Sequence, residues 1–198
     1  MTHYFDADQA AASEPRLITM RLPGLTVDLT TDRGVFSGSR VDPGTDILLR
    51  KAPHPPRDGD LLDLGCGYGP IACALAIRSP GARIWAVDTN RRALELVRDT
   101  AERLNLTNVE AVEPDAVPIE VRFAAIYSNP PVRIGKQPLH ELLTRWLALL
   151  QSDGAAYLVV QRHLGADPLA AWIEDQGHAV RRLAAKRSYR VIEVRTPV

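Results

Sequence analysis

The stretch of sequence that decides the fold is LLDLGCGYGP, residues 61–70. A short apolar run ends at Leu64, glycines stand at positions 65, 67 and 69, and the small-residue pattern IACALA begins at residue 71. Glycines allow a tight turn and let a ligand approach the backbone, and Pro70 suits the first position of a helix. The stretch predicts a strand, a glycine turn and a helix, although the glycines alone are equally typical of an ordinary strand-to-helix connection.

An acid after the next strand favours a nucleoside ligand. The apolar run 84–87 ends at Asp88, and an acid about 20 residues after such a turn can accept hydrogen bonds from both ribose hydroxyls. The dinucleotide-binding pattern has a third glycine at the position of Pro70, which this chain lacks. The acid before the turn, Asp63, suits a ligand with an amino group better than one with phosphates. We therefore expect an adenosine with a cationic tail rather than a dinucleotide.

Outward from this unit, apolar runs alternate with helical periods. The apolar runs are 61–64, 84–87, 109–112, 124–127 and 157–160, and helical patterns cover 94–104, 139–150 and 168–176. The last two runs, 179–183 and 189–194, are too close for a crossover helix and predict an antiparallel hairpin at a sheet edge. The expected fold class is α/β, a doubly wound and mainly parallel sheet with helices on both faces.

The chain before residue 57 has a different pattern. Runs 16–22 and 25–30 flank a Pro23-Gly24 turn and predict a small β element, and the stretch APHPP, residues 52–56, is the best linker candidate. We expect a single domain over 1–198, with an N-terminal β element on the substrate side in 1–50 and a cofactor-binding core in 57–198.

Composition narrows the class of protein. The 198 residues carry 24 basic and 24 acidic side chains, which argues against nucleic-acid binding by bulk charge alone. Two cysteines, Cys66 and Cys73, are too few for a disulfide framework and favour a reducing compartment. We find no membrane span or signal peptide and no metal-ligand spacing, so we expect a cytoplasmic protein without a metal or a membrane partner. The oligomeric state is left open.

A second motif, SNPP at residues 128–131, follows the run 124–127. The carboxyl edge of an open α/β sheet is where such folds place their chemistry. Two prolines fix φ and remove two backbone donors, so the segment presents acceptors only, namely the Asn129 side-chain oxygen and the Pro130 carbonyl. This pair suits a planar –NH2 group, while a Pro-rich loop is the structural alternative.

Together these motifs resemble class I methyltransferases that use S-adenosylmethionine. More narrowly, GVFS (34–37), DPGT (42–45) and NPPVRIGK (129–136) are similar to the small-domain methyltransferases that modify guanine exocyclic amines in ribosomal RNA of the small subunit. The resemblance covers Tyr4 to Val194 and implies a seven-stranded sheet with an antiparallel hairpin. It also implies RNA, ribosomal RNA or a ribosomal subunit, as the partner.

The resemblance and the motifs together assign candidate residues. The catalytic candidates are Asn129, Pro130 and Pro131, and the substrate-binding candidates are Phe36, Arg133 and Lys136. The cofactor-binding candidates are Asp63, Gly65, Cys66, Gly67, Tyr68, Gly69, Asp88, Thr89, Asn90, Asp115 and Asn129. Asp115 stands where the resemblance places an acidic contact to the adenine amine, with a surface-loop acid as the alternative.

Several alternatives stay open. Many relatives have an aromatic residue after Asn-Pro-Pro, whereas this chain has Val132, so a stacking residue must come from elsewhere, with Phe36 the candidate. Some relatives carry a second methyltransferase-like domain, for which 198 residues leave no room. The basic C-terminal segment, residues 181–195, is either a phosphate-binding face or a solvated hairpin. Rival functions are methylation of a protein glutamine or a small molecule, and non-catalytic nucleoside or RNA binding.

Overall fold

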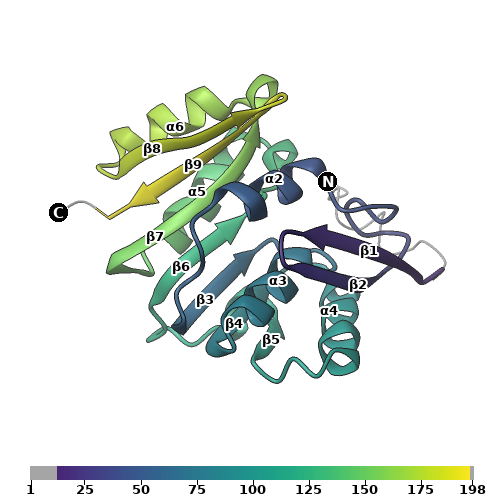
Figure 1. Ribbon diagram of the computed structural model, residues 1–198. Coiled ribbons are helices and arrows are strands. Elements are labelled where there is room, and N and C mark those ends of the chain that lie inside the picture. The colour runs from purple at the N-terminus through teal and green to yellow at the C-terminus, as the bar shows by residue number, and fades with distance from the viewer. Residues whose placement is uncertain (1–12, 197–198) are drawn as a thin grey trace.

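The computed structural model describes residues 13–196, and its main feature is a seven-stranded sheet (Figure 1). The strand order is β5-β4-β3-β6-β7-β9-β8. The strands are β3 (Asp58–Leu64), β4 (Gly81–Val87), β5 (Val109–Val112), β6 (Phe123–Ser128), β7 (Leu150–Gln161), β8 (Ala179–Lys186) and β9 (Tyr189–Arg195). Strands β3 to β7 pair in parallel, and β9 is antiparallel to both β7 and β8. The expected fold class, with its edge hairpin, is confirmed.

Helices cover both faces of this sheet. Helices α2 (Pro43–Lys51), α3 (Pro70–Arg78) and α4 (Arg91–Arg103) share one apolar core, and α5 (Lys136–Leu147) and α6 (Ala166–Asp175) share the other. Because side chains alternate along a strand, Leu61 enters the first core and Leu62 the second. Within residues 13–196, no helix has the length and apolar character needed to cross a membrane.

A two-stranded hairpin precedes the main sheet. Strands β1 (Arg16–Leu22) and β2 (Leu25–Thr31) pair antiparallel around the Pro23-Gly24 turn. Met20 and Val27 face the core while their neighbours are exposed, as the alternating pattern predicts. Strand β2 packs on α4, where the Thr30 amide donates to Thr100 Oγ1 at 3.2 Å. The first twelve residues of the expected element 1–50 lie outside the described residues.

The rest of that N-terminal element is not β structure. Residues 43–51 form α2, which packs against β7 and β9 of the main sheet. The local reason is a complete set of helix signals: Asp42 caps the first turn, Pro43 occupies its start, and Arg50 and Lys51 lie in the last turn. The expected small β element is confirmed over residues 16–31, whereas the helix α2 that follows it within 1–50 was not predicted.

Strand register determines where the motifs meet. Leu64 of β3 lies opposite Val87 of β4 on one side and Ser128 of β6 on the other. The three parallel strands end at one edge of the sheet, at the point where the strand order reverses around β3. The residues after these strands therefore begin next to one another at that edge.

Candidate active site

The glycine turn leaves an open space above the end of β3. The amides of Gly65 and Cys66 donate to the Val87 carbonyl at 2.8 and 3.0 Å, which fixes the turn to β4. Gly67 has a φ of +54°, and a Cβ added there would meet no atom within 4 Å. Cys66 is buried, and burial raises the pKa of its thiol, as expected of a structural residue rather than a nucleophile.

Asp88 holds the turn from the neighbouring strand. Its Oδ2 accepts from the Gly67 amide and its Oδ1 from the Asn90 amide, both at 2.9 Å. Burial raises the pKa of Asp88, and these backbone hydrogen bonds oppose the rise. Asn90 caps α4 and donates through Nδ2 to the Gly34 carbonyl at 3.0 Å, while Thr89 is exposed. Asp88 therefore faces the open turn, and Asn90 connects it to the segment that contains Phe36.

Asp63 lies beneath the turn with half of its carboxylate unpaired. It is fully buried, and its Oδ2 accepts from the Ala72 amide at 2.8 Å. Its Oδ1 has no hydrogen-bond partner among the residues that the structure describes. Burial, with a smaller contribution from the charge of Asp88, raises the pKa of Asp63 to about 8. The site thus contains a buried acid with one free acceptor.

Asn129 lies at the end of β6 with its side-chain nitrogen already engaged. Nδ2 donates to Asp42 Oδ1 at 2.8 Å and to Thr45 Oγ1 at 3.2 Å. The strand below is tied to β3 because Ser128 Oγ donates to the Leu64 carbonyl at 2.7 Å. The side-chain oxygen of Asn129 is therefore the end that remains available to a ligand.

The two prolines form a stiff turn beside the glycines. The Val132 amide donates to the Pro130 carbonyl at 2.8 Å, so this carbonyl keeps one of its two lone pairs. A Cβ added at Gly65 would lie 3.9 Å from Pro131 Cδ, which shows how closely the two turns approach. The Pro130 carbonyl is therefore a partly used acceptor, next in the chain to the Asn129 side-chain oxygen.

The remaining candidates are mostly exposed, and two of them form contacts of their own. Phe36 is 67% exposed, and Arg133 in the short helix η2 (Val132–Ile134) and Lys136 at the start of α5 are exposed. Tyr68 is buried and its hydroxyl donates to the Arg40 carbonyl at 3.4 Å. Asp115, in η1 (Pro114–Ala116), forms an exposed ion pair with Arg145 at 2.9 Å. In the described part of the chain, no group of three metal-ligating side chains gathers.

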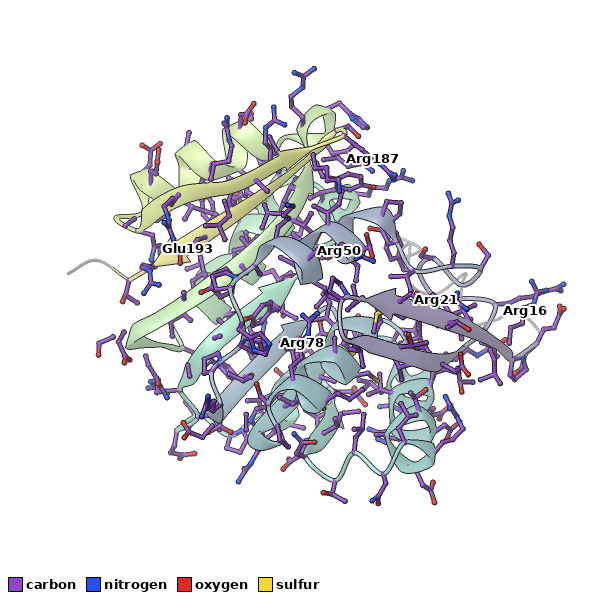
Figure 2. All side chains as sticks on the ribbon, in the orientation of Figure 1. Arg16, Arg21, Arg50, Arg78, Arg187 and Glu193 are labelled. Atoms are coloured by element: carbon purple, nitrogen blue, oxygen red, sulfur yellow. The ribbon has the colours of Figure 1, made fainter. Side chains whose placement is uncertain are left out.

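The basic C-terminal segment divides into two parts. Arg181 and Arg195 pair with the buried Glu193, each within 3.0 Å, at the far end of the hairpin from the site. Lys186 and Arg187 lie at the β8–β9 turn, and neither has an ion-pair partner within residues 13–196. Figure 2 shows Arg187 and Glu193 near opposite ends of β9. Because Gln161 at the end of β7 pairs with Tyr189, the β8–β9 turn lies at the carboxyl edge, as Asn129 does.

A groove of about 460 Å³ lies beside the centre, between β1 and residues 39–46. It is lined by Arg21 of β1 and by Arg40 and Val41, which directly precede Asp42. Asp46 in its wall is paired with Arg50 at 2.8 Å. Figure 2 shows Arg21 on β1 and Arg50 on α2, and the Arg50 guanidinium donates to the Arg21 carbonyl.

The sequence prediction gave no role to Asp42 or Thr45. A local signal existed, because Asp42-Pro43 is typical of a helix start. Asp42 lies 87 positions and Thr45 84 positions before Asn129 in the sequence. No local pattern therefore indicates that they contact its side chain.

Several known proteins with a similar sequence or fold are named methyltransferases. The sequence model of the methyltransferase small domain family matches residues 26–193. The uncharacterized protein YbxB of Bacillus subtilis is 32% identical over 196 residues, which cover 98% of each chain. Ribosomal RNA small subunit methyltransferase C of Aeromonas hydrophila is 34% identical over 170 residues, which cover 84% of this chain and 46% of the relative.

A solved structure extends the comparison. The T. thermophilus 16S rRNA N2 G1207 methyltransferase (RsmC), in complex with AdoMet and guanosine, is 28% identical with a TM-score of 0.80. The match covers 93% of this chain and 51% of that one. The chain thus spans nearly all of YbxB and about half the length of the two ribosomal RNA methyltransferases. The chain belongs to the methyltransferase small domain family, a family of S-adenosylmethionine-dependent methyltransferases.

Proposed function

We propose that the chain transfers the methyl group of S-adenosylmethionine to an exocyclic amine of a nucleobase, with guanine in ribosomal RNA as the acceptor. The observation that carries the proposal is the orientation of Asn129. Its nitrogen donates to Asp42 and Thr45, so its oxygen and the Pro130 carbonyl offer acceptors beside the glycine turn. Two acceptors with no donor suit a group with two hydrogens, which is an –NH2.

The residues of the turn fit the expected cofactor. An ammonium group beside Asp63 favours the ionised form of this acid, in which the unpartnered Oδ1 is an acceptor for it. The open side of Gly67 leaves room for close approach to the backbone. Asp88 lies where a ribose diol would be held. When bound, S-adenosylmethionine supplies a methyl group on a sulfonium, which is a good leaving group.

Asn129 and Pro130 contribute orientation and hydrogen bonds to the acceptor. The lone pair of a guanine amine is delocalised into the ring, so this nitrogen is a poor nucleophile. Hydrogen bonds from both of its hydrogens favour a more pyramidal nitrogen and aim its lone pair for a direct in-line displacement. Positioning of two reactants in this way can lower the activation free energy by roughly 7–11 kcal/mol.

Unpaired cations around the carboxyl edge support an RNA substrate. Arg133, Lys136, Lys186 and Arg187 form no ion pair within the described residues, and we call these four the basic rim. Phosphate groups are the anions that such exposed cations position without reading sequence. The groove beside Asp42, lined by Arg21 and Arg40, offers room for a nucleotide next to the target base.

Phe36 is the proposed stacking residue in place of the missing aromatic at Val132. Its ring is 67% exposed, and its segment is anchored because Asn90 donates to the Gly34 carbonyl. An exposed ring at a nucleoside site can stack on an unpaired base. The ribosomal RNA relatives in the comparison support this acceptor and, with it, a cytoplasmic location.

Single-turnover methylation with Asn129→Ala tests the proposal. The substrate is ribosomal RNA from cells that lack the chain, and the cofactor is saturating. Loss of a preorganised group at a reacting centre should lower the rate by about 100- to 1000-fold. Cofactor affinity should stay unchanged because the glycine turn is intact. A rate within a few-fold of wild type would show that the Asn-Pro-Pro segment is only a turn.

Two controls separate the alternatives. Gln137→Ala removes an exposed side-chain amide that, among residues 13–196, bonds only Glu141, so its rate should equal that of wild type. A glutamine-containing peptide presents a similar planar –NH2 and is assayed in parallel. Methylation of the peptide but not of the RNA would show that the methyl acceptor is a protein glutamine and not a nucleobase.

A further inference from the structure

We propose that Asp42 is a positioning residue that fixes the amide of Asn129 with its oxygen toward the methyl acceptor. The inference rests on the proposed function of Asn129. It assigns the orientation of this amide to a carboxylate 87 positions earlier in the chain.

One oxygen of Asp42 joins the helix start to the reaction centre. Asp42 Oδ1 accepts from the Gly44 amide at 2.8 Å, from the Thr45 amide at 3.2 Å and from Asn129 Nδ2 at 2.8 Å. Thr45 Oγ1, on a side chain that is 3% exposed, accepts from the same Nδ2 at 3.2 Å. Both hydrogens of the Asn129 amide therefore have an acceptor.

The opposite orientation of the amide is unfavourable. A flipped Asn129 would bring its oxygen against the Asp42 carboxylate and lose that hydrogen bond, because a carboxylate only accepts, whereas the Thr45 hydroxyl could bond to either end of the amide. A bond from an amide N–H to a charged carboxylate also draws electron density toward the amide oxygen. Asp42 thus selects the oxygen as the presented atom and makes it a stronger acceptor.

The start of α2 is held firmly enough to transmit this effect. A Cβ added at Gly44 would lie 2.7 Å from Tyr189 Cε1 and 2.8 Å from Asp42 Oδ1, so the backbone there is packed against β9. Tyr189 is itself buried, and its hydroxyl accepts from Gln161 Nε2 at 2.6 Å. Asp42 has little freedom to move away from Asn129.

Asp42→Ser separates the positioning role from the helix cap. Serine is a good N-cap, so α2 should remain capped, but its side chain is one atom shorter and loses Asn129. The single-turnover rate should fall by about 10- to 100-fold, the value of a charge-assisted hydrogen bond. Cofactor affinity and melting temperature should stay near those of wild type. Asp99→Ser, the same substitution at an exposed acid of α4, should leave the rate unchanged.

Asp42→Asn keeps the helix cap and an oxygen acceptor. It is the variant to measure if Asp42→Ser does not fold. It removes only the charge, so its rate should fall less than that of Asp42→Ser but remain below wild type. A wild-type rate in either variant overturns the proposal.

A double-mutant cycle shows whether Asp42 acts through Asn129. Adding Asp42→Ser to Asn129→Ala should change the rate by less than about 3-fold, because the group that Asp42 holds is gone. An equal loss in both backgrounds would mean that Asp42 acts independently, which overturns the positioning role. If Asn129→Ala has no effect, the proposed function fails first. If only Asp42→Ser has none, the positioning role alone fails.

Discussion

Two carboxylates of the same site, Asp63 and Asp88, are held in different ways. Both oxygens of Asp88 accept backbone hydrogen bonds, whereas one oxygen of the fully buried Asp63 has no partner among the described residues. Burial raises the pKa of both, in the case of Asp63 to about 8. The two acids should therefore contribute differently to ligand affinity and to folding.

We expect Asp88→Ala to weaken S-adenosylmethionine binding. The proposed bonds to the ribose hydroxyls are worth about 1.5–3 kcal/mol each, which corresponds to a loss of affinity of one to a few decades. Calorimetry on the folded variant measures this loss. Asp99→Ala, an exposed acid on α4, is the control and should bind like wild type. Equal affinity of Asp88→Ala and wild type would contradict the ribose assignment.

Asp63 should make the stability of the fold depend on pH. The folded state keeps a proton on Asp63 up to about pH 8, while the unfolded chain loses it near the ordinary value of 3.8. The unfolded state then binds fewer protons, so the free energy of unfolding falls as pH rises between these values, by up to about 1.4 kcal/mol per unit. Asp63→Asn removes this dependence.

Urea unfolding of wild type and Asp63→Asn at pH 6, 7, 8 and 9 measures the difference. The stability of the variant relative to wild type should increase from pH 6 to pH 8 and level off above it. Other titrating groups are common to both proteins and cancel in the difference. A difference that is constant with pH would show that Asp63 titrates normally.

At the scale of elements, two glycines of the glycine turn have different roles, one in packing and one in leaving space for a ligand. Gly69 has a φ of +86°, and a Cβ there would lie 2.8 Å from Val97 Cγ2 on α4. Gly67 has a φ of +54° and open space around it. The two glycines share the left-handed conformation but differ in what surrounds them.

Alanine at each glycine should therefore have a different effect. Gly67→Ala should cost about 1–2 kcal/mol of strain and lower cofactor affinity at least about 10-fold, because the new methyl group enters the space of the ligand. Gly69→Ala adds a clash worth about 1–3 kcal/mol and should be the less stable protein. Urea unfolding and calorimetry give both quantities. Wild-type affinity in Gly67→Ala would mean that the cofactor does not approach this side of the turn.

The elements that the sequence predicted best are those with a local pattern. The βα units around Gly65, Asp88 and Asn129 were predicted with the correct type and order, because strand and helix periods are local properties. Strand β7 extends back to Leu150 through the half-buried Gln151 and the exposed residues 152–153, which no apolar run indicates. Helix α2 was missed because no helical pattern was assigned to residues 43–51, although Asp42 and Pro43 are signals of a helix start.

At the scale of the whole molecule, a net charge of zero does not describe the carboxyl edge of the sheet. The chain has 24 basic and 24 acidic side chains, yet four cations of the basic rim lie unpaired around one edge of the sheet. From the sequence, residues 181–195 were predicted to be one basic segment. Its division depends on Glu193 and Asp167, which pair with arginines of the segment only in the folded protein.

Lys186→Ala with Arg187→Ala should weaken RNA binding without regard to sequence. Each phosphate contact that is lost should reduce the slope of log affinity against log salt by about one unit. Arg57→Ala with Arg122→Ala removes the same charge before β3 and β6, at the opposite edge of the sheet, and should change neither slope nor affinity. Cofactor affinity should be unaffected in both pairs. Equal slopes of log affinity against log salt in the two double variants would mean that the β8–β9 turn does not contact RNA and that other residues do.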